Sequence, residues 1–420
     1  MPASTEVDDY AGIAPATEGA DALVTSIFQG RGQSLLGGPA NGNLPCIVKR
    51  LRTIVPVIAI SWSLCSCSAP ETTSKQAEAM EPDAWSSATP VDVITDLDVP
   101  WSMVIVGDEV LVSQRDRMDI LAFRLGEEAR RLRAVPNAAT PLDGGVLGLA
   151  AFEEGDLDRN GRSWIYAYHS TASDNRIVRM AYANGALGSP EIVFTGIPAG
   201  NGHNGGRIAF GPDGMLYVAT GETRQPAFSQ DPQSLAGKIL RMTPEGGVPE
   251  DNPFAGSVVY SMGHRNPQGL AWDDQGHLWE TEFGDKEWDE LNRIEPGKNY
   301  GWPAVQGRAD DPDYVDPVVQ WRTSVMGPSG LAYFDGTFFV AGLTGQRIWS
   351  VTFDAAGRPL TEAHFIGTYG RIRDVAEGPD GTLWFLTNNT DGRGDAPAPD
   401  DDRILSVPIL STGSARRQGA

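Results

Sequence analysis

A two-strand pattern recurs six times between residues 109 and 407, and it constrains the fold more than any other feature of the chain. Each copy has a polar Gly/Asp turn, a first strand, a loop and a second strand in which Ile or Leu alternates with Arg or Ser. The first strands cover 109–112, 163–168, 215–219, 277–280, 337–340 and 382–386. The second strands cover 119–123, 176–180, 238–242, 292–294, 346–351 and 402–407. The copies are about 45–60 residues apart, a spacing that suits blades of four strands.

These repeats predict an all-β fold, a six-bladed β-propeller with four-stranded antiparallel blades over residues 91–410. Closure of the ring would pair strands from its two ends, around 91–104 and 402–410. Two loops, after Gly221 and after Asn388, are long and rich in polar, Gly and Pro residues. Long loops at one end of a rigid ring are candidate walls of a binding site, and neutral insertion is the alternative for each.

The net charge of −22 over 420 residues excludes a nucleic-acid binder, which needs a basic surface, and electrostatic docking on anionic lipid. A protein this acidic that binds an anion must build a local cluster of arginines. Its carboxylates suit Ca²⁺, which takes oxygen ligands, although most of them serve only solubility.

The first 90 residues are expected to be a targeting region rather than part of the fold. Residues 48–67 resemble a lipoprotein signal peptide, with a basic start, a short apolar stretch and a lipid anchor at Cys67. Residues 68–90 would be a flexible tether, and 411–420 a C-terminal tail. The unpatterned residues 1–47 indicate either a misplaced start codon near Val48 or a genuine extension. We therefore expect a periplasmic or cell-surface lipoprotein that meets the membrane only through its anchor. The three cysteines, Cys46, Cys65 and Cys67, all precede the folded region, so neither a disulfide framework nor a cysteine zinc site is available to it.

A polar loop at 263–269, Gly-His-Arg-Asn-Pro-Gln-Gly, follows an apolar strand. Loops on rigid strands concentrate binding residues, whereas a polar surface turn is the plainer interpretation. Arg265 and Asn266 are the candidates to face a ligand, Pro267 and Gly269 shape the turn, and His264 is expected to be structural.

His203 lies in a glycine-rich approach to the third repeat, and Glu222 ends the strand that this approach feeds. A histidine with a carboxylate to orient it is a candidate general base, although a turn-capping His203 and a solvated Glu222 are the structural alternatives. Asp143, before the second repeat, is expected to face the central channel. Arg371 and Arg373 lie on one face of a strand and favour an oxyanion ligand, with pairing to local acids as the alternative.

Several motifs together make the chain resemble the soluble pyrroloquinoline quinone (PQQ)-dependent sugar dehydrogenases, the glucose/sorbosone dehydrogenase family, from about residue 95 to 408. The resemblance is closest to the aldose dehydrogenase branch. It is carried by Pro100-Trp101, Gly145 to Gly148, His203 to Arg207, Gly263 to Gly269, Asn299 to Pro303 and Arg371 to Asp374. The family is a six-bladed propeller, which agrees with the repeats.

The resemblance implies oxidation of an aldose at C1 to its lactone, with a hydride passed to PQQ and electrons then passed to an external acceptor. His203 would be the base, oriented by Glu222, and Arg265 would stabilise charge on the quinone oxygen. Cofactor contacts are implied for Asp143, Asn266, Arg371, Arg373 and the position of Thr344. Backbone oxygens of Gly284 and Asp285 would hold a catalytic Ca²⁺, and Glu290 with the Tyr300 carbonyl a structural Ca²⁺.

Three positions depart from the family pattern: Thr344 replaces a lysine that contacts PQQ, Glu222 replaces an Asp, and Asp285 replaces a Pro. Two other functions therefore compete with the dehydrogenase. One is a divalent-metal propeller lactonase that uses Glu222, Asn204 and Asp143. The other is a non-catalytic lipoprotein that binds a sugar or PQQ.

Overall fold

The computed structural model describes residues 88–140, 143–152 and 163–409. The proposed N-terminal extension, the signal peptide with Cys67, most of the tether and the C-terminal tail lie outside the described residues. In the part that is described, no helix is long and apolar enough to cross a bilayer.

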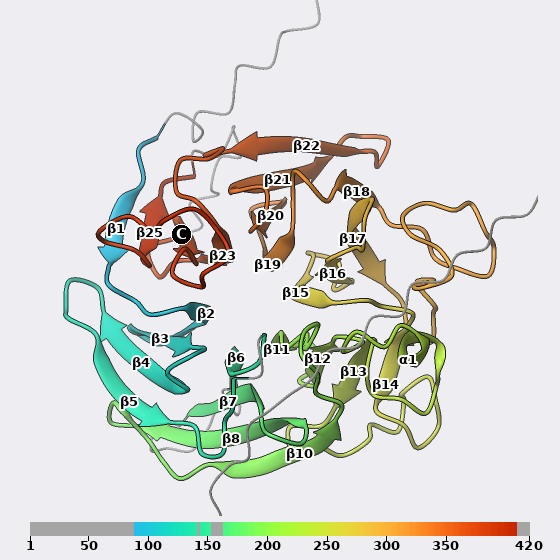
Figure 1. Ribbon diagram of the computed structural model, residues 1–420, viewed down its shortest axis with the longest axis horizontal. Coiled ribbons are helices and arrows are strands. Elements are labelled where there is room, and N and C mark those ends of the chain that lie inside the picture. The colour runs from blue at the N-terminus through green and yellow to red at the C-terminus, as the bar shows by residue number, and fades with distance from the viewer. Residues whose placement is uncertain (1–87, 141–142, 153–162, 410–420) are drawn as a thin grey trace, which may run out of the picture. The chain divides into compact units, whose positions relative to one another are not determined.

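Six antiparallel sheets stand around a common centre, which confirms the predicted six-bladed β-propeller (Figure 1). Blade 1 contains β2 (Pro100–Val106), β3 (Glu109–Gln114), β4 (Asp119–Arg124) and β5 (Arg130–Ala134). Blade 2 contains β6 (Val146–Phe152), β7 (Ser163–Ser170), β8 (Asn175–Ala183) and β10 (Glu191–Ile197), with the short β9 (Ala186–Leu187) paired to β8. Blade 3 contains β11 (Ile208–Phe210), β12 (Leu216–Thr220), β13 (Lys238–Met242) and β14 (Val259–Met262), and the short helix α1 (Ala227–Gln230) lies between β12 and β13 in the chain.

The remaining blades follow the same order from the centre outwards. Blade 4 contains β15 (Pro267–Trp272), β16 (Leu278–Glu282), β17 (Trp288–Ile294) and β18 (Val319–Arg322). Blade 5 contains β19 (Pro328–Phe334), β20 (Thr337–Gly342), β21 (Arg347–Phe353) and β22 (Pro359–His364). Blade 6 contains β23 (Ile372–Glu377), β24 (Leu383–Thr387), β25 (Ile404–Val407) and, from the other end of the ring, β1 (Val91–Ile94). The two strands of each sequence repeat are therefore the second and third strands of a blade.

The ring closes through the antiparallel pair β1 and β25, in which Val91 lies opposite Ser406. This pairing agrees with the expected closure for residues 91–94, whereas residues 100–106 form the innermost strand of blade 1 instead. The N-terminal strand β1 thus completes blade 6 as its outermost strand, and this pairing ties the two ends of the ring together.

Six buried apolar clusters coincide with the six seams between neighbouring blades. Tyr166 of blade 2 packs in one cluster with Leu216 of blade 3, for example, and Phe339 of blade 5 packs with Phe385 of blade 6. Alternation along each strand places one set of side chains toward the preceding blade and the other set toward the following blade. The seams therefore form the apolar core, and the centre of the ring is held by polar and charged contacts.

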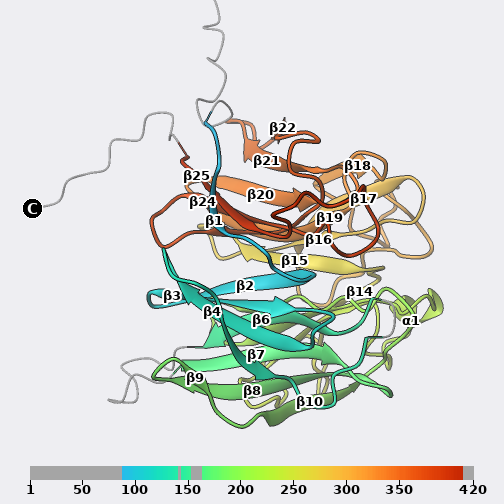
Figure 2. The ribbon, with the colours of Figure 1, turned by 60° about the vertical axis from the view of Figure 1, so that its left-hand side comes forward.

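At the centre, one buried ion pair joins strands from opposite sides of the ring. Arg207, just before β11, places Nη1 3.0 Å from Oδ2 of Asp374 on β23. The same guanidinium donates from Nε to the Gln268 carbonyl at 2.8 Å and lies over the Trp101 ring at 4.6 Å. The pair links blades 1, 3, 4 and 6 (Figure 2 shows β2 and β15 near the middle of the molecule).

We predict that Asp374→Asn lowers the free energy of unfolding by about 3–5 kcal/mol, because it leaves the Arg207 charge buried without its partner. Urea denaturation followed by tryptophan fluorescence measures the change. Asp108→Asn, in the exposed pair with Arg124, is the matched control and should cost less than about 1 kcal/mol. Equal effects of the two substitutions would show that the central pair has no special importance.

Candidate active site

A cavity of about 230 Å³ opens at one end of the ring, where the loops entering innermost strands meet the loops leaving second strands. Antiparallel pairing brings these two kinds of loop together, because the start of an innermost strand lies beside the end of the second strand. Residues from all six blades line the cavity: Trp101, Arg115, Asp143, His203, Arg224, Arg265, Asn266, Gln268, Phe283, Leu343, Thr344, Arg371, Arg373 and Arg393.

The cavity lining is strongly basic although the protein is acidic. Six of the lining residues are arginines, and Asp143 is the only carboxylic acid among the described residues that line it. Buried guanidinium nitrogens without a hydrogen-bond partner include Nε of Arg265 and Nε of Arg371. Burial, and then the charge of Arg371, lowers the pKa of Arg373 to about 9. A bound anion would satisfy these groups and relieve the repulsion between them.

The two arginines predicted to share a strand face both line the cavity. Arg371 pairs with Asp391 at 3.0 Å, and Arg373 donates to Asn388 Oδ1 and Gln268 Oε1. Asp374, the acid next to Arg373 in the sequence, pairs with Arg207 instead. Local acids therefore neutralise Arg371, while Arg373 has only neutral hydrogen-bond partners.

His203 and Glu222 lie together at this end of the ring, as the sequence predicted. His203 Nδ1 is 2.6 Å from Glu222 Oε1, and the carboxylate side chain is 2% exposed. A carboxylate accepts hydrogen bonds, so this contact favours the imidazole tautomer with its proton on Nδ1, in which Nε2 carries the lone pair. His203 holds this position with a left-handed φ of 54°, a conformation that is uncommon for residues other than glycine.

Backbone hydrogen bonds fix this pair relative to the loop at 263–269. The Glu222 N–H donates to the Arg265 carbonyl at 2.8 Å, and the Thr223 N–H donates to the His203 carbonyl at 3.1 Å. Asn266 Oδ1 accepts the Gly205 N–H at 3.1 Å. The candidate base, its carboxylate and the candidate ligand-binding loop therefore form one connected unit.

The residues of that loop have different roles, as expected. Arg265, Asn266 and Gln268 line the cavity, and Pro267 begins β15. His264 is fully buried, places Nε2 2.8 Å from Ser261 Oγ, and stacks on Tyr300 with ring centroids 4.8 Å apart. His264 thus faces away from the cavity, in agreement with its expected structural role.

Three of the four residues predicted to bind calcium, Gly284, Asp285 and Glu290, lie on the hairpin of β16 and β17, and the fourth, Tyr300, follows β17 in the chain. Arg265 donates to the Phe283 carbonyl at 3.2 Å and lies 3.3 Å from Asp285 Oδ1, so oxygen atoms surround the Gly284–Asp285 turn beside the cavity. Glu290 accepts the Gly307 N–H at 2.8 Å, and burial, together with the charge of Glu282, raises its pKa to about 8. Tyr300 is buried, and its hydroxyl donates to the Arg293 carbonyl.

Sequence reasoning missed three cavity arginines, Arg115, Arg224 and Arg393. Arg224 and Arg393 lie in the long loops after Gly221 and Asn388 that were predicted as candidate walls, and Arg393 pairs with Asp143. Arg115 directly follows β3. The three arginines share one feature that the sequence shows: each follows the end of the second strand of a blade. Thr344 occupies the same kind of position, after β20, and also lines the cavity.

Comparison with known proteins agrees with this geometry. Residues 97–396 match the family described as Glucose / Sorbosone dehydrogenase. The chain is 30% identical to the aldose sugar dehydrogenase YliI of Escherichia coli, with 72% of this chain and 91% of that protein covered. The PQQ-bound aldose sugar dehydrogenase of Streptomyces coelicolor shares 47% identity with a TM-score of 0.71, covering 76% of this chain and 97% of that one. A putative oxidoreductase (glucose dehydrogenase) of a Thermus species shares 39% identity with a TM-score of 0.70, covering 76% and 99%.

The basic cavity predicts that a small polycarboxylate stabilises the protein. Citrate should raise the melting temperature in differential scanning fluorimetry, because it binds only the folded state. Arg393→Gln should weaken the apparent affinity for citrate about tenfold or more, since a charge-assisted hydrogen bond is worth about 1.5–3 kcal/mol. Arg124→Gln, on the outside of blade 1, should leave the citrate effect unchanged. A citrate response that is the same in all three proteins would contradict an anion site in the cavity.

Proposed function

This chain belongs to the glucose/sorbosone dehydrogenase family, and from that premise we propose that it oxidises an aldose sugar at C1 to the lactone, with PQQ as the electron acceptor. The observation that carries the proposal is the His203–Glu222 pair at the wall of an arginine-lined cavity. The reduced cofactor would then pass its electrons to an external acceptor.

The cavity residues fit PQQ by their chemistry. The cofactor carries three carboxylates, and six arginines with two unpartnered buried Nε atoms surround the cavity. Arg371 and Arg373 would bind carboxylates, and Asn266, which also lines the cavity, would contact the cofactor. Asp143 would reach it through its partner Arg393. Thr344 supplies a hydroxyl at the position where the family pattern has a lysine.

The protein's own residues would perform the acid–base part of the reaction. Nε2 of His203 would take the proton from the anomeric hydroxyl, while Glu222 keeps the ring oriented and balances the imidazolium charge. When bound, PQQ supplies the quinone that accepts the hydride from sugar C1. Arg265, whose side chain is 12% exposed and is held by the Phe283 carbonyl and Asp285, would present positive charge where the quinone oxygen gains electrons.

We also propose a catalytic Ca²⁺ at the turn beside the cavity. The exposed Asp285 carboxylate is a hard oxygen ligand there, although in this structure it and the Phe283 carbonyl both contact Arg265. Gly284 and Asp285 would hold the ion, which would polarise the quinone carbonyl. We also propose Glu290 and the Tyr300 carbonyl as ligands of a structural Ca²⁺, and anchoring of the protein in the periplasm or at the cell surface through Cys67.

The lactonase alternative has less support. A divalent-metal hydrolase needs carboxylates and amides that converge on one ion in the central channel. Asp143 pairs with Arg393, and Glu222 orients His203, so these two carboxylates are already engaged.

Reconstitution tests the proposed function. The purified protein, given PQQ and Ca²⁺, should reduce an artificial electron acceptor at a rate that depends on added aldose. PQQ binding without turnover would favour the non-catalytic binding protein, and a failure to bind PQQ would reject the dehydrogenase.

His203→Gln should lower kcat by about 10²–10⁴-fold, because the general base is lost. PQQ affinity, measured by fluorescence quenching, should change little. His277→Gln is the matched control, since His277 also pairs with a carboxylate, Asp273 at 3.0 Å, but lies on the surface. Turnover that survives in His203→Gln would show that another group takes the proton.

Thr344→Lys should tighten PQQ binding about tenfold or more, because it adds a charge-assisted contact to an anionic cofactor. Thr361→Lys, on the exposed outer strand β22 of the same blade, controls for a general effect of added charge. An unchanged dissociation constant in Thr344→Lys would mean that the cavity arginines already saturate the cofactor's charge.

A further inference from the structure

A buried group of polar side chains lies at the seam between blades 3 and 4, behind the active-site loop. Its members are His264, Glu280, Glu282 and Asn292, which we call the seam cluster. Glu280 and Glu282 alternate along β16, and Asn292 lies opposite Glu280 on β17, so these three side chains share one face of blade 4. The exposed fraction of each of the four residues is 4% or less.

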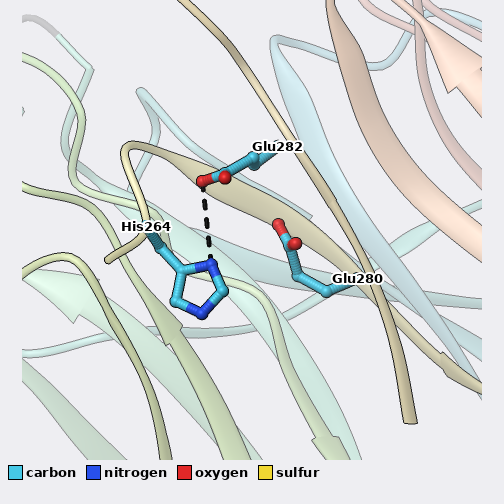
Figure 3. Close-up of side chains that lie close together, drawn as sticks. All are labelled: His264, Glu280 and Glu282. Carbon is cyan, nitrogen blue, oxygen red and sulfur yellow. Dashed lines mark ion pairs between the residues drawn. The ribbon is translucent and has the colours of Figure 1, made fainter. Parts of the chain in front are cut away.

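The ligand atoms of the seam cluster converge. One atom each from His264, Glu280 and Glu282 lies within 4.8 Å of the other two, and Figure 3 shows the imidazole and both carboxylates pointing toward one another. His264 Nδ1 is 3.9 Å from Glu282 Oε2, which is too long for a hydrogen bond. That separation leaves room for one cation at about 2.0–2.4 Å from each atom.

Three buried atoms of the cluster have no hydrogen-bond partner: His264 Nδ1, Glu280 Oε1 and Asn292 Oδ1. The opposite sides of the same groups are engaged. His264 Nε2 contacts Ser261 Oγ at 2.8 Å, and Asn292 Nδ2 donates to Glu280 Oε2 at 3.2 Å. A metal-bound histidine usually donates its second ring N–H to a fixed acceptor, and Ser261 provides one here.

The cluster also lacks a compensating charge. Glu280 and Glu282 are both buried, and in the described residues neither a lysine nor an arginine forms an ion pair with either of them. Burying two carboxylates without a cation is costly, because each loses its hydration. A divalent ion would remove that cost.

We propose that the seam cluster binds a first-row transition-metal ion, of the Mn²⁺ or Zn²⁺ type, through His264 Nδ1, Glu280, Glu282 and Asn292 Oδ1. An imidazole nitrogen combined with carboxylate and amide oxygens suits such an ion, whereas Ca²⁺ takes oxygen ligands. The site uses other ligands than the Glu290–Tyr300 pair but adjoins it, because Asn292 Nδ2 also donates to Glu290 Oε2 at 3.2 Å and His264 stacks on Tyr300. It joins the exit of blade 3 to the second strand of blade 4.

The position of this site gives the ion a structural role behind the active site. Glu282 Oε2 accepts the Arg265 N–H at 2.7 Å, and the Arg265 carbonyl accepts the Glu222 N–H. A metal held by Glu282 would thus fix the loop that carries Arg265 and, through it, the carboxylate that orients His203.

Metal binding to the full-length protein tests the proposal. After treatment with EDTA and dialysis, excess Ca²⁺ is restored to fill oxygen-only sites, and Mn²⁺ is then titrated and followed by electron paramagnetic resonance. We expect one tightly bound equivalent that Zn²⁺ displaces. Glu280→Gln should weaken Mn²⁺ binding at least about 10–100-fold, whereas Glu287→Gln, an exposed acid on the same hairpin, should leave it unchanged.

Thermal unfolding distinguishes a metal site from a cluster of acids without metal, because the two predict different effects of Mn²⁺ and of Glu280→Gln on the melting temperature. If the cluster binds metal, Mn²⁺ raises the melting temperature of the unmodified protein but not that of Glu280→Gln. If it binds none, Glu280→Gln raises the melting temperature equally with and without Mn²⁺, because it removes repulsion, and the proposal is wrong.

Pulsed electron paramagnetic resonance of the unmodified protein with one equivalent of Mn²⁺ needs no variant. Coupling to a single ¹⁴N nucleus supports ligation by His264, and absence of nitrogen coupling overturns it.

Discussion

The buried pair of Arg207 and Asp374 is the interaction on which the rest of the structure depends. A propeller buries apolar side chains at the seams between its blades, so its centre must be held by other means. Here a single guanidinium contacts a carboxylate from blade 6, a backbone carbonyl from blade 4 and an indole from blade 1. A buried pair of this kind fixes relative position more than it adds net stability. It fixes the distance between the innermost strands, and this distance sets the positions of the loops at their ends.

The active site follows from this arrangement. Each blade contributes the loop that enters its innermost strand or the loop that leaves its second strand, so chemically different residues converge on one opening. The repeated geometry explains how an acidic protein keeps six arginines in one cavity: Arg371 and Arg373 come from the start of β23, and the other four come from loops of blades 1, 3, 4 and 6 that meet at the same end of the ring. His203 has a left-handed φ at this end, and the buried Nε atoms of Arg265 and Arg371 have no partner. A bound anion would satisfy the unpartnered nitrogens.

Much of this could be predicted from the sequence, because the second and third strands of each blade carry a strong alternating pattern. The innermost strands were harder to recognise, since β11 has only three residues and follows a run of glycines. His203 and Glu222 were predicted together because His203 precedes the first strand of blade 3 and Glu222 follows the second, so antiparallel pairing brings them to the same end of the blade. Arg115, Arg224 and Arg393 were not, since the direction of a loop side chain depends on contacts with other blades. Glu280 gave no signal either, because a polar residue in a strand usually faces solvent and only the position of blade 3 buries it.

The central claim is that His203 removes a proton from a sugar whose hydride passes to PQQ held by the arginines of the cavity. Anaerobic mixing of the PQQ-loaded protein with an aldose, in the absence of any external acceptor, isolates that single step. Stopped-flow absorbance should show the reduced cofactor forming in an amount equal to the bound PQQ, together with one equivalent of lactone. An oxidised cofactor spectrum that persists in the presence of aldoses, despite full occupancy of the cavity, would contradict the account.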